Sequence, residues 1–282
     1  MSLSFSKLQT YRRCPKQYEF AVIKKIPRRI SAGESFGSSI HHTLKRWGEL
    51  EMERQYVPEM KKQLVLFTED EQGRARNAPI DLTVLLTLFR ECFIAEGYEC
   101  REDRDIPLKR GESILKDFFD WWKREQREIV TIESGFKLLL SRHKKELILS
   151  GRFDRVERTK TGVRIIDYKT SAARTQEEVD ADLQLSIYAL AAAQQWDEPV
   201  TELVLLFLTE DGLIERRTTR TSAQLNEATM MIRSLEHGIE SEDFHATPSR
   251  EKCRHCPYRE MCPFRAPTPN PSPLRGEGEL YS

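Results

Sequence analysis

The stretch that most constrains the fold runs over residues 151–170, where two strand-like runs flank a polar turn at residues 159–162. Side chains of equal parity share one face of a strand, so Asp167 and Lys169 leave the end of an apolar strand on the same side. Asp154 lies in the partner strand, close to where that end falls. Two carboxylates and one ammonium group at the rim of a sheet are typical of a divalent-metal site with a charged helper. A surface ion pair between Asp167 and Lys169 is the simpler alternative.

The remaining pattern predicts a chain that mixes strands and helices. Its strand-like runs predict an antiparallel meander followed by a buried strand and a hairpin partner, at residues 129–140, 146–157, 163–170, 203–208 and 214–219. Apolar residues at helical spacing predict helices at residues 36–47, 81–95, 111–126, 182–196 and 223–240. Asp81 and Asp182 are the first residues of two of these ranges and are expected to cap the helices. The Pro- and Gly-rich residues 266–282 are expected to form a disordered tail.

Charge is balanced over the chain but not along it. The formal net charge is zero, so the chain as a whole lacks the basicity of many nucleic-acid-binding proteins. Residues 1–30 nevertheless carry eight lysines and arginines against one acid, Glu19, and such a patch can attract phosphate. A solvated basic face is the plainer interpretation. No apolar run approaches the length of a membrane span and no signal region is recognisable, so we expect a cytoplasmic protein without membrane contact.

The cysteines form the second informative pattern. Cys253, Cys256 and Cys262 give C-x2-C-x5-C in a Pro-flanked segment, and disulfides are rare in cytosolic proteins. Cys14 shares the Cys-Pro context and is the expected fourth ligand of a metal centre. Zinc also takes four cysteines, or three cysteines and one histidine, here His255. The spacing does not decide between an iron–sulfur cluster and zinc.

Four short motifs and the cysteine pattern together resemble a known family. The chain contains G-x-x-x-H-x-x-L, G-x-x-D, D-x-K and Q-x-x-x-Y motifs, and it resembles the RecB-type branch of the PD-(D/E)XK nucleases over residues 4–264. The early cysteine and the C-x2-C-x5-C pattern are similar to the AddB-type iron–sulfur variant. Glu133 matches, less closely, an acidic residue that family members carry upstream. The motif residues are Gly37, His41, Leu44, Gly151, Asp154, Asp167, Lys169, Gln184 and Tyr188.

The resemblance implies an α/β, restriction-endonuclease-like fold, in which helices flank a mixed central sheet. It implies one nuclease domain over residues 1–265, with a helical insertion at about 50–128 and a nuclease core at about 129–220. The Cys-rich C-terminal arm then occupies residues 250–265.

The resemblance also assigns roles to the motif residues. His41, Asp154 and Asp167 would hold Mg2+ or Mn2+, and the carbonyl oxygen of Tyr168 would add a ligand. His42 adjoins His41, and the spacing from the glycine and leucine of the first motif favours His41. Lys169 would orient the attacking water or stabilise developing charge.

Gln184 and Tyr188 lie one helical turn apart and would contact the DNA backbone or brace Lys169. Positions on a solvated helix surface are the alternative for both residues. Cys14, Cys253, Cys256 and Cys262 would hold a structural [4Fe-4S] cluster, with zinc as the alternative.

The function implied is a metal-dependent DNA nuclease, an exonuclease acting on single strands or ends in repair or recombination. No G-x-x-x-x-G-K-[ST] loop is present, so a helicase partner would be a separate chain. A CRISPR-adaptation-type nuclease and a non-catalytic, helicase-associated DNA-binding module are the alternatives.

Overall fold

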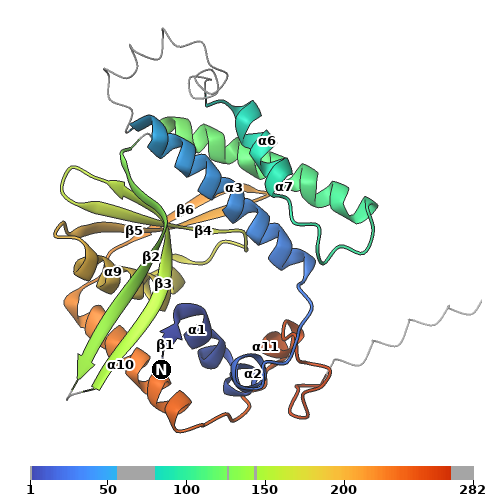
Figure 1. Ribbon diagram of the computed structural model, residues 1–282, viewed down its shortest axis with the longest axis vertical. Coiled ribbons are helices and arrows are strands. Elements are labelled where there is room, and N and C mark those ends of the chain that lie inside the picture. Colours follow the sequence, from blue (N-terminus) through green and yellow to red (C-terminus); the bar gives the residue numbers. More distant parts are fainter. Residues whose placement is uncertain (1, 56–79, 126, 143–144, 268–282) are drawn as a thin grey trace, which may run out of the picture. The chain divides into compact units, whose positions relative to one another are not determined.

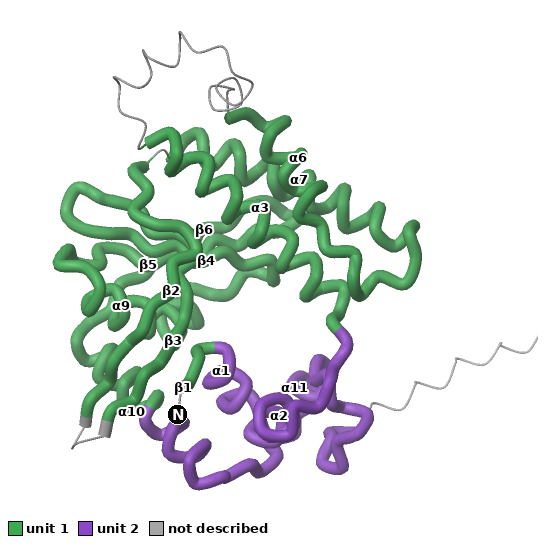
Figure 2. The backbone as a smooth tube through the Cα atoms, in the orientation of Figure 1, with its two compact units in different colours: residues 1–5, 30–232 green, residues 6–29, 233–282 purple. Residues whose placement is uncertain are grey.

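The computed structural model describes residues 2–55, 80–125, 127–142 and 145–267 (Figure 1). Residues 56–79 of the expected helical insertion and residues 268–282 of the expected disordered tail lie outside the described residues. The chain divides into two compact units (Figure 2). Unit 1 comprises residues 1–5 and 30–232, and unit 2 comprises residues 6–29 and 233–282. The single domain expected over residues 1–265 stays a prediction.

A six-stranded mixed sheet forms the centre of unit 1. The predicted meander is present as β2 (Ile129–Arg142), β3 (Lys145–Arg158) and β4 (Val163–Lys169), which pair antiparallel in that order. The predicted hairpin is β5 (Val200–Thr209) and β6 (Gly212–Thr218), and β5 runs parallel to β4. Because β4 and β5 are parallel, their connection must cross over the sheet, and helices supply it.

β3 is long enough to serve three partners. β2 pairs along one of its edges, while the other edge pairs with β1 (Ser2–Ser4) near its start and with β4 near its end. The sequence pattern does not predict β1, because three residues carry no periodic signal and the strand exists through its pairing with β3.

Three helices cover one face of the sheet: α3 (Ala32–Gln55), α6 (Leu82–Cys92) and α7 (Glu102–Arg124) (Figure 1). Their apolar side chains form one buried cluster with the even-numbered residues Ile166 and Tyr168 of β4. Asp81 caps α6 by accepting a hydrogen bond from the backbone N–H of Val84, as predicted. Both α3 and α7 begin earlier than predicted.

The crossover from β4 to β5 contains α8 (Gln176–Asp180) and α9 (Leu183–Gln195). Asp182 caps α9 by accepting a hydrogen bond from the N–H of Leu185, as predicted. α9 packs against β2 and β5. Helices therefore flank a mixed central sheet, which confirms the expected fold class.

Unit 2 joins segments from both ends of the chain. It contains most of α1 (Phe5–Arg13), then α2 (Pro15–Tyr18), a π-helical turn at Glu19–Ile23, the last turns of α10 (Ser222–Glu240) and α11 (Arg250–Arg254). The hydroxyl of Tyr11 donates to the carbonyl of Asp243, and that of Tyr258 donates to the carbonyl of Ile26. The sequence pattern predicted α10 as the last helix, but the short α11 follows it. Among the described residues, no helix combines the length and hydropathy of a membrane span.

Candidate active site

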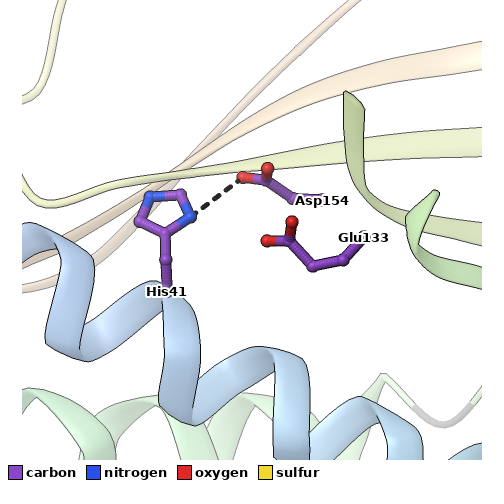
Figure 3. Close-up of side chains that lie close together, drawn as sticks. All are labelled: His41, Glu133 and Asp154. Atoms are coloured by element: carbon purple, nitrogen blue, oxygen red, sulfur yellow. Dashed lines mark ion pairs between the residues drawn. The ribbon is translucent and has the colours of Figure 1, made fainter. Parts of the chain in front are cut away.

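Three donor side chains converge at the rim of the sheet in unit 1: His41 of α3, Glu133 of β2 and Asp154 of β3 (Figure 3). Their ligand atoms all lie within 4.8 Å of one another. The Nδ1 atom of His41 is 3.4 Å from Oδ2 of Asp154. One imidazole and two carboxylates form a donor set that suits Mg2+ or Mn2+.

Gly37 explains how α3 brings His41 to this position. It precedes the histidine by about one helical turn. A Cβ atom on Gly37 would lie 3.1 Å from Oγ1 of Thr170, which follows the end of β4. The glycine thus permits close approach of α3 to that strand end, and the His41 ring packs edge-on against Tyr168. His42 is exposed and is not one of the three converging residues.

Asp154 lies where β3 and β4 separate. The ladder between them ends at the pair Arg155↔Ile166, and the carboxylate of Asp154 accepts the backbone N–H of Tyr168 at 2.9 Å. The Asp154 carboxylate therefore accepts a hydrogen bond that a backbone carbonyl would accept in a continued ladder. Phe153 packs against the ring of Tyr188, whereas Arg155 pairs with Glu51 of α3.

This contrast between positions 153 and 155 marks a break in the strand, because residues i and i+2 of a regular strand share a face. Glu133 lies opposite the break, between the pairs Ile132↔Arg155 and Ser134↔Phe153. Its φ angle of 48° is in the left-handed region, which is uncommon for a glutamate. Irregularities of this kind redirect side chains and are frequent beside active sites.

Asp167, Lys169, Gln184 and Tyr188 form a second group on the α9 side of the sheet. The ammonium of Lys169 pairs with Oδ2 of Asp167 and donates to Oε1 of Gln184 at 2.9 Å. The amide of Gln184 and the hydroxyl of Tyr188 donate to Oδ1 of Asp167 at 2.8 and 2.9 Å. Asp167 is only 2% exposed, so these contacts fix both of its oxygens.

The two groups are electrostatically coupled. Burial raises the pKa of Asp154 well above its usual value, and the charge of Asp167 adds to the shift. Burial lowers the pKa of His41, although the charge of Asp167 partly opposes this. Burial alone would lower the pKa of Lys169, but the charge and hydrogen bond of Asp167 together with the charge of Asp154 outweigh burial, so the pKa is raised and the ammonium persists. Burial also raises the pKa of Tyr188, and the charge of Asp167 makes a smaller contribution in the same direction.

An open cleft of about 500 Å³ leads to the donor group. His41, Glu133 and Lys169 are among the residues that line it. The N-terminal half of α3, the β2–β3 pair and the end of β4 supply the side chains that line it. These include Glu34, His41, His42, Lys45, Glu133, Arg152 and Lys169.

The sequence-predicted site residues thus fall into two contacting sets. His41 and Asp154 lie together, and Glu133, which the sequence indicated only weakly, joins them. Asp167 lies outside that group and contacts Lys169 and α9 instead. Tyr168 directs its side chain into the core and its N–H toward Asp154. The signal for Glu133 is an acid in a strand otherwise rich in apolar residues.

The four cysteines of the second pattern line one small void in unit 2. Burial raises the pKa of Cys256, and the nearby thiols of Cys14 and Cys262 contribute. Burial would raise the pKa of Cys14, but hydrogen bonds from Thr247 and the backbone at the start of α2 lower it overall. Thiolate-stabilising donors of this kind favour a metal ligand.

The kind of metal centre that these four cysteines would hold stays a prediction, with zinc as the alternative to an iron–sulfur cluster. His255 is exposed and does not line the void.

This chain is similar to three known proteins. The sequence is 23% identical over 290 residues to the Gene 69 protein of Mycobacterium phage L5, covering 92% of this chain and 95% of that protein. The crystal structure of SSO0001 aligns with a TM-score of 0.45 at 14% identity, over 94% of this chain and 87% of that one. A Eubacterium rectale protein provisionally described as an exonuclease aligns with a TM-score of 0.39 at 12% identity, over 72% and 82%.

The family comparison covers nearly the whole described chain. The sequence profile of the PD-(D/E)XK nuclease superfamily matches residues 2–263, which include both contacting sets of site residues and all four cysteines of the void. This protein belongs to the PD-(D/E)XK nuclease superfamily.

Proposed function

We propose that this protein is a divalent-metal-dependent deoxyribonuclease that acts as an exonuclease on single-stranded DNA or DNA ends, in repair or recombination. The observation that carries the proposal is the convergence of His41, Glu133 and Asp154, with His41, Glu133 and Lys169 lining an open cleft. The chemistry of the donor set fits a hard divalent cation. The raised pKa of Asp154 agrees, because a buried acid whose charge is only partly offset by its neighbours is the group that a cation would stabilise.

In this proposal His41, Asp154 and Glu133 hold Mg2+ or Mn2+, with Asp167 and the Tyr168 carbonyl as further ligands. The cation would supply Lewis-acid chemistry, lowering the pKa of a coordinated water and neutralising charge on the phosphate. Lys169 carries a persistent positive charge beside the site and stabilises the charge that develops on the phosphate oxygens.

Gln184 and Tyr188 act as bracing residues in this scheme. Their hydrogen bonds to Asp167 and Lys169 favour bracing over a direct contact with the DNA backbone. Tyr188 is also 2% exposed, which leaves little of its side chain for a polymer.

We further propose that Cys14, Cys253, Cys256 and Cys262 hold a structural [4Fe-4S] cluster that clips the two ends of the chain together within unit 2. The proposal is supported by the four cysteines lining one void and by the Cys-Pro context of Cys14, Cys256 and Cys262, and zinc is the alternative metal. An absorption spectrum of anaerobically purified protein tests this. We expect a broad band near ~400 nm, typical of thiolate-to-iron charge transfer; a colourless protein with stoichiometric zinc would overturn the cluster.

The nuclease proposal is tested by incubating purified protein with end-labelled linear DNA, single- and double-stranded, and with covalently closed circles, in Mg2+ or Mn2+. We expect loss of linear substrate from the ends, intact circles, and no cleavage by Lys169→Ala. Equal cleavage by the wild-type protein and this variant would show that the activity belongs to a contaminant. DNA retention without cleavage in any metal would support the non-catalytic, helicase-associated module instead. A separate helicase chain as a partner stays a prediction.

A further inference from the structure

We infer that Arg152 binds a backbone phosphate of the DNA next to the scissile one, and that it exchanges Glu133 for this phosphate when a cation occupies the donor group. The inference rests on the proposed nuclease function and adds a phosphate-binding subsite to it. Arg152 belongs to the G-x-x-D motif but has no role in the chemistry described above.

The position of Arg152 is fixed by its neighbours in β3. A Cβ atom on Gly151 would lie 2.3 Å from the ring of Phe136 on β2, so the strand must carry a glycine there. Phe136 in turn packs against Phe153 and Tyr188. This close packing fixes the backbone on either side of Arg152, two residues before Asp154, and the side chain lines the cleft.

The environment of Arg152 differs from that of the arginines in the core. Its side chain is 63% exposed, and its ion pair among the described residues is one contact of 3.2 Å between Nη1 and Glu133. Arg155 and Arg164 are instead buried and each is surrounded by two or more acids. A guanidinium held by one contact at an open cleft keeps most of its donors for another partner.

The charge of that partner follows from the cleft. Lys45 and Lys169 line the same cleft as Arg152, so three basic side chains face the two acids of the lining, Glu34 and Glu133. A guanidinium presents donors in a planar fork that matches phosphate oxygens, and it is the preferred side chain for bidentate phosphate contacts. The subsite therefore suits an anionic phosphate.

Glu133 connects this subsite to the donor group. The same carboxylate contacts Arg152 and lies within 4.8 Å of the ligand atoms of His41 and Asp154. A cation on Glu133 would repel the guanidinium and share the carboxylate charge, so Arg152 would gain by moving to a phosphate. Without DNA, Arg152 and the cation compete for Glu133; with DNA, the competition is relieved.

The test uses Arg152→Gln and Arg152→Lys, with Lys137→Gln as the matched control, because Lys137 is exposed on β2 and does not line the cleft. All variants are made in the full-length Lys169→Ala protein, which the proposed function predicts to be inert. Anisotropy of a labelled single-stranded oligonucleotide over a salt series reports DNA binding, and calorimetry reports Mn2+ binding without DNA. Thermal melts check folding.

We expect Arg152→Gln to weaken oligonucleotide binding about tenfold or more and to reduce the salt slope by about 0.7. The same change should tighten Mn2+ binding in the absence of DNA. The oligonucleotide affinity of Arg152→Lys should lie between those of Arg152→Gln and the protein with Arg152 intact, because lysine keeps the positive charge but lacks the planar fork of donors. Lys137→Gln should alter neither DNA binding nor Mn2+ binding.

Two results would overturn the inference. One is an unchanged DNA affinity and salt slope for Arg152→Gln. The other is a parallel loss of DNA and Mn2+ binding, which would mean that Arg152 only supports Glu133. These outcomes are separate from failure of the proposed function, which is absence of cleavage by the protein with Lys169 intact.

Discussion

The β3–β4 pair holds buried charge in two opposite ways. Within the ladder Arg155 and Arg164 are buried but meet opposite charges from helices and strands alike. Just past the last ladder pair, Arg155↔Ile166, the acids Asp154 and Asp167 lie within reach of each other, and burial together with the charge of Asp167 raises the pKa of Asp154. The acids that surround the two arginines are Glu51, Glu125, Glu157, Glu202 and Glu215.

This difference separates a structural network from a site. A buried ion pair with all its partners present needs no ligand, and removal of one partner is costly. A buried acid with a raised pKa is unfavourable in the free protein and gains when a cation arrives. The β3–β4 pair therefore carries a closed network around Arg155 and Arg164 and an incomplete one around Asp154 and Asp167. The neighbours of the incomplete one, His41, Glu133 and Lys169, line the cleft.

The largest expected effect is on cleavage. Asp154→Asn keeps an acceptor for the N–H of Tyr168 but removes the ligand charge, so we expect the rate of DNA cleavage to fall about a thousandfold or more. Single-turnover kinetics in Mn2+ measures it. Asp211→Asn, at the exposed turn between β5 and β6, is the control and should cleave normally. A rate within a few fold of the wild-type protein would remove Asp154 from the site.

Substitutions in the closed network around Arg155 and Arg164 should lower the stability of the protein rather than its cleavage rate. Arg164→Met removes the buried cation that Glu125, Glu202 and Glu215 share and leaves them only their more exposed pairs with Arg127 and Arg217, so we expect the free energy of unfolding to fall by about 3–5 kcal/mol. Urea titration of the metal-free protein measures it. Arg158→Met removes the exposed pairs with Glu128 and Glu198 and should cost less than about 1 kcal/mol. Equal losses would mean that burial does not distinguish the two arginines.

A smaller effect is expected for the bracing hydroxyl. Tyr188→Phe removes one donor to Asp167 and leaves the aromatic packing against Phe153, so we expect cleavage to slow about tenfold. Oligonucleotide affinity, measured by anisotropy, should not change. If DNA affinity falls while the rate at saturating DNA holds, Tyr188 contacts the substrate rather than Asp167.

The smallest effect tests the sign of the pKa shift. The pKa of Asp154 is raised in the folded protein, so the folded state favours the protonated form and stability is lost as pH rises above the usual range of aspartate. Asparagine cannot ionise. In EDTA at neutral pH we therefore expect Asp154→Asn to melt at a higher temperature than the wild-type protein, with the gap closing toward acid pH. A lower melting temperature at neutral pH would reverse the assigned sign.

Much of the fold follows from local pattern. The apolar runs predict the β2–β4 meander and the β5–β6 hairpin, and Asp81 and Asp182 cap the helices that they precede. The helix expected at residues 81–95 ends at Cys92, because Phe93 adopts an extended conformation. β1 depends on pairing with β3, which no three-residue pattern can signal.

The site was predictable in part. Side-chain parity places Asp167 and Lys169 on one face, and they are in contact. Parity fails at Asp154, because the strand is irregular between Phe153 and Arg155, and the φ angle that directs Glu133 to the donor group arises from the same irregularity. The burial of Arg155 and Arg164 depends on acids from distant segments, so the sequence does not reveal it.

The most direct test of the central claim is a calorimetric titration of metal-free protein with Mn2+, comparing His41→Ala with His42→Ala. The two residues are adjacent on α3, but only His41 belongs to the donor group. We predict that His41→Ala weakens Mn2+ binding by on the order of a hundredfold, while His42→Ala binds as the wild-type protein does. Equal affinities for the two variants would contradict a cation held by His41, Glu133 and Asp154.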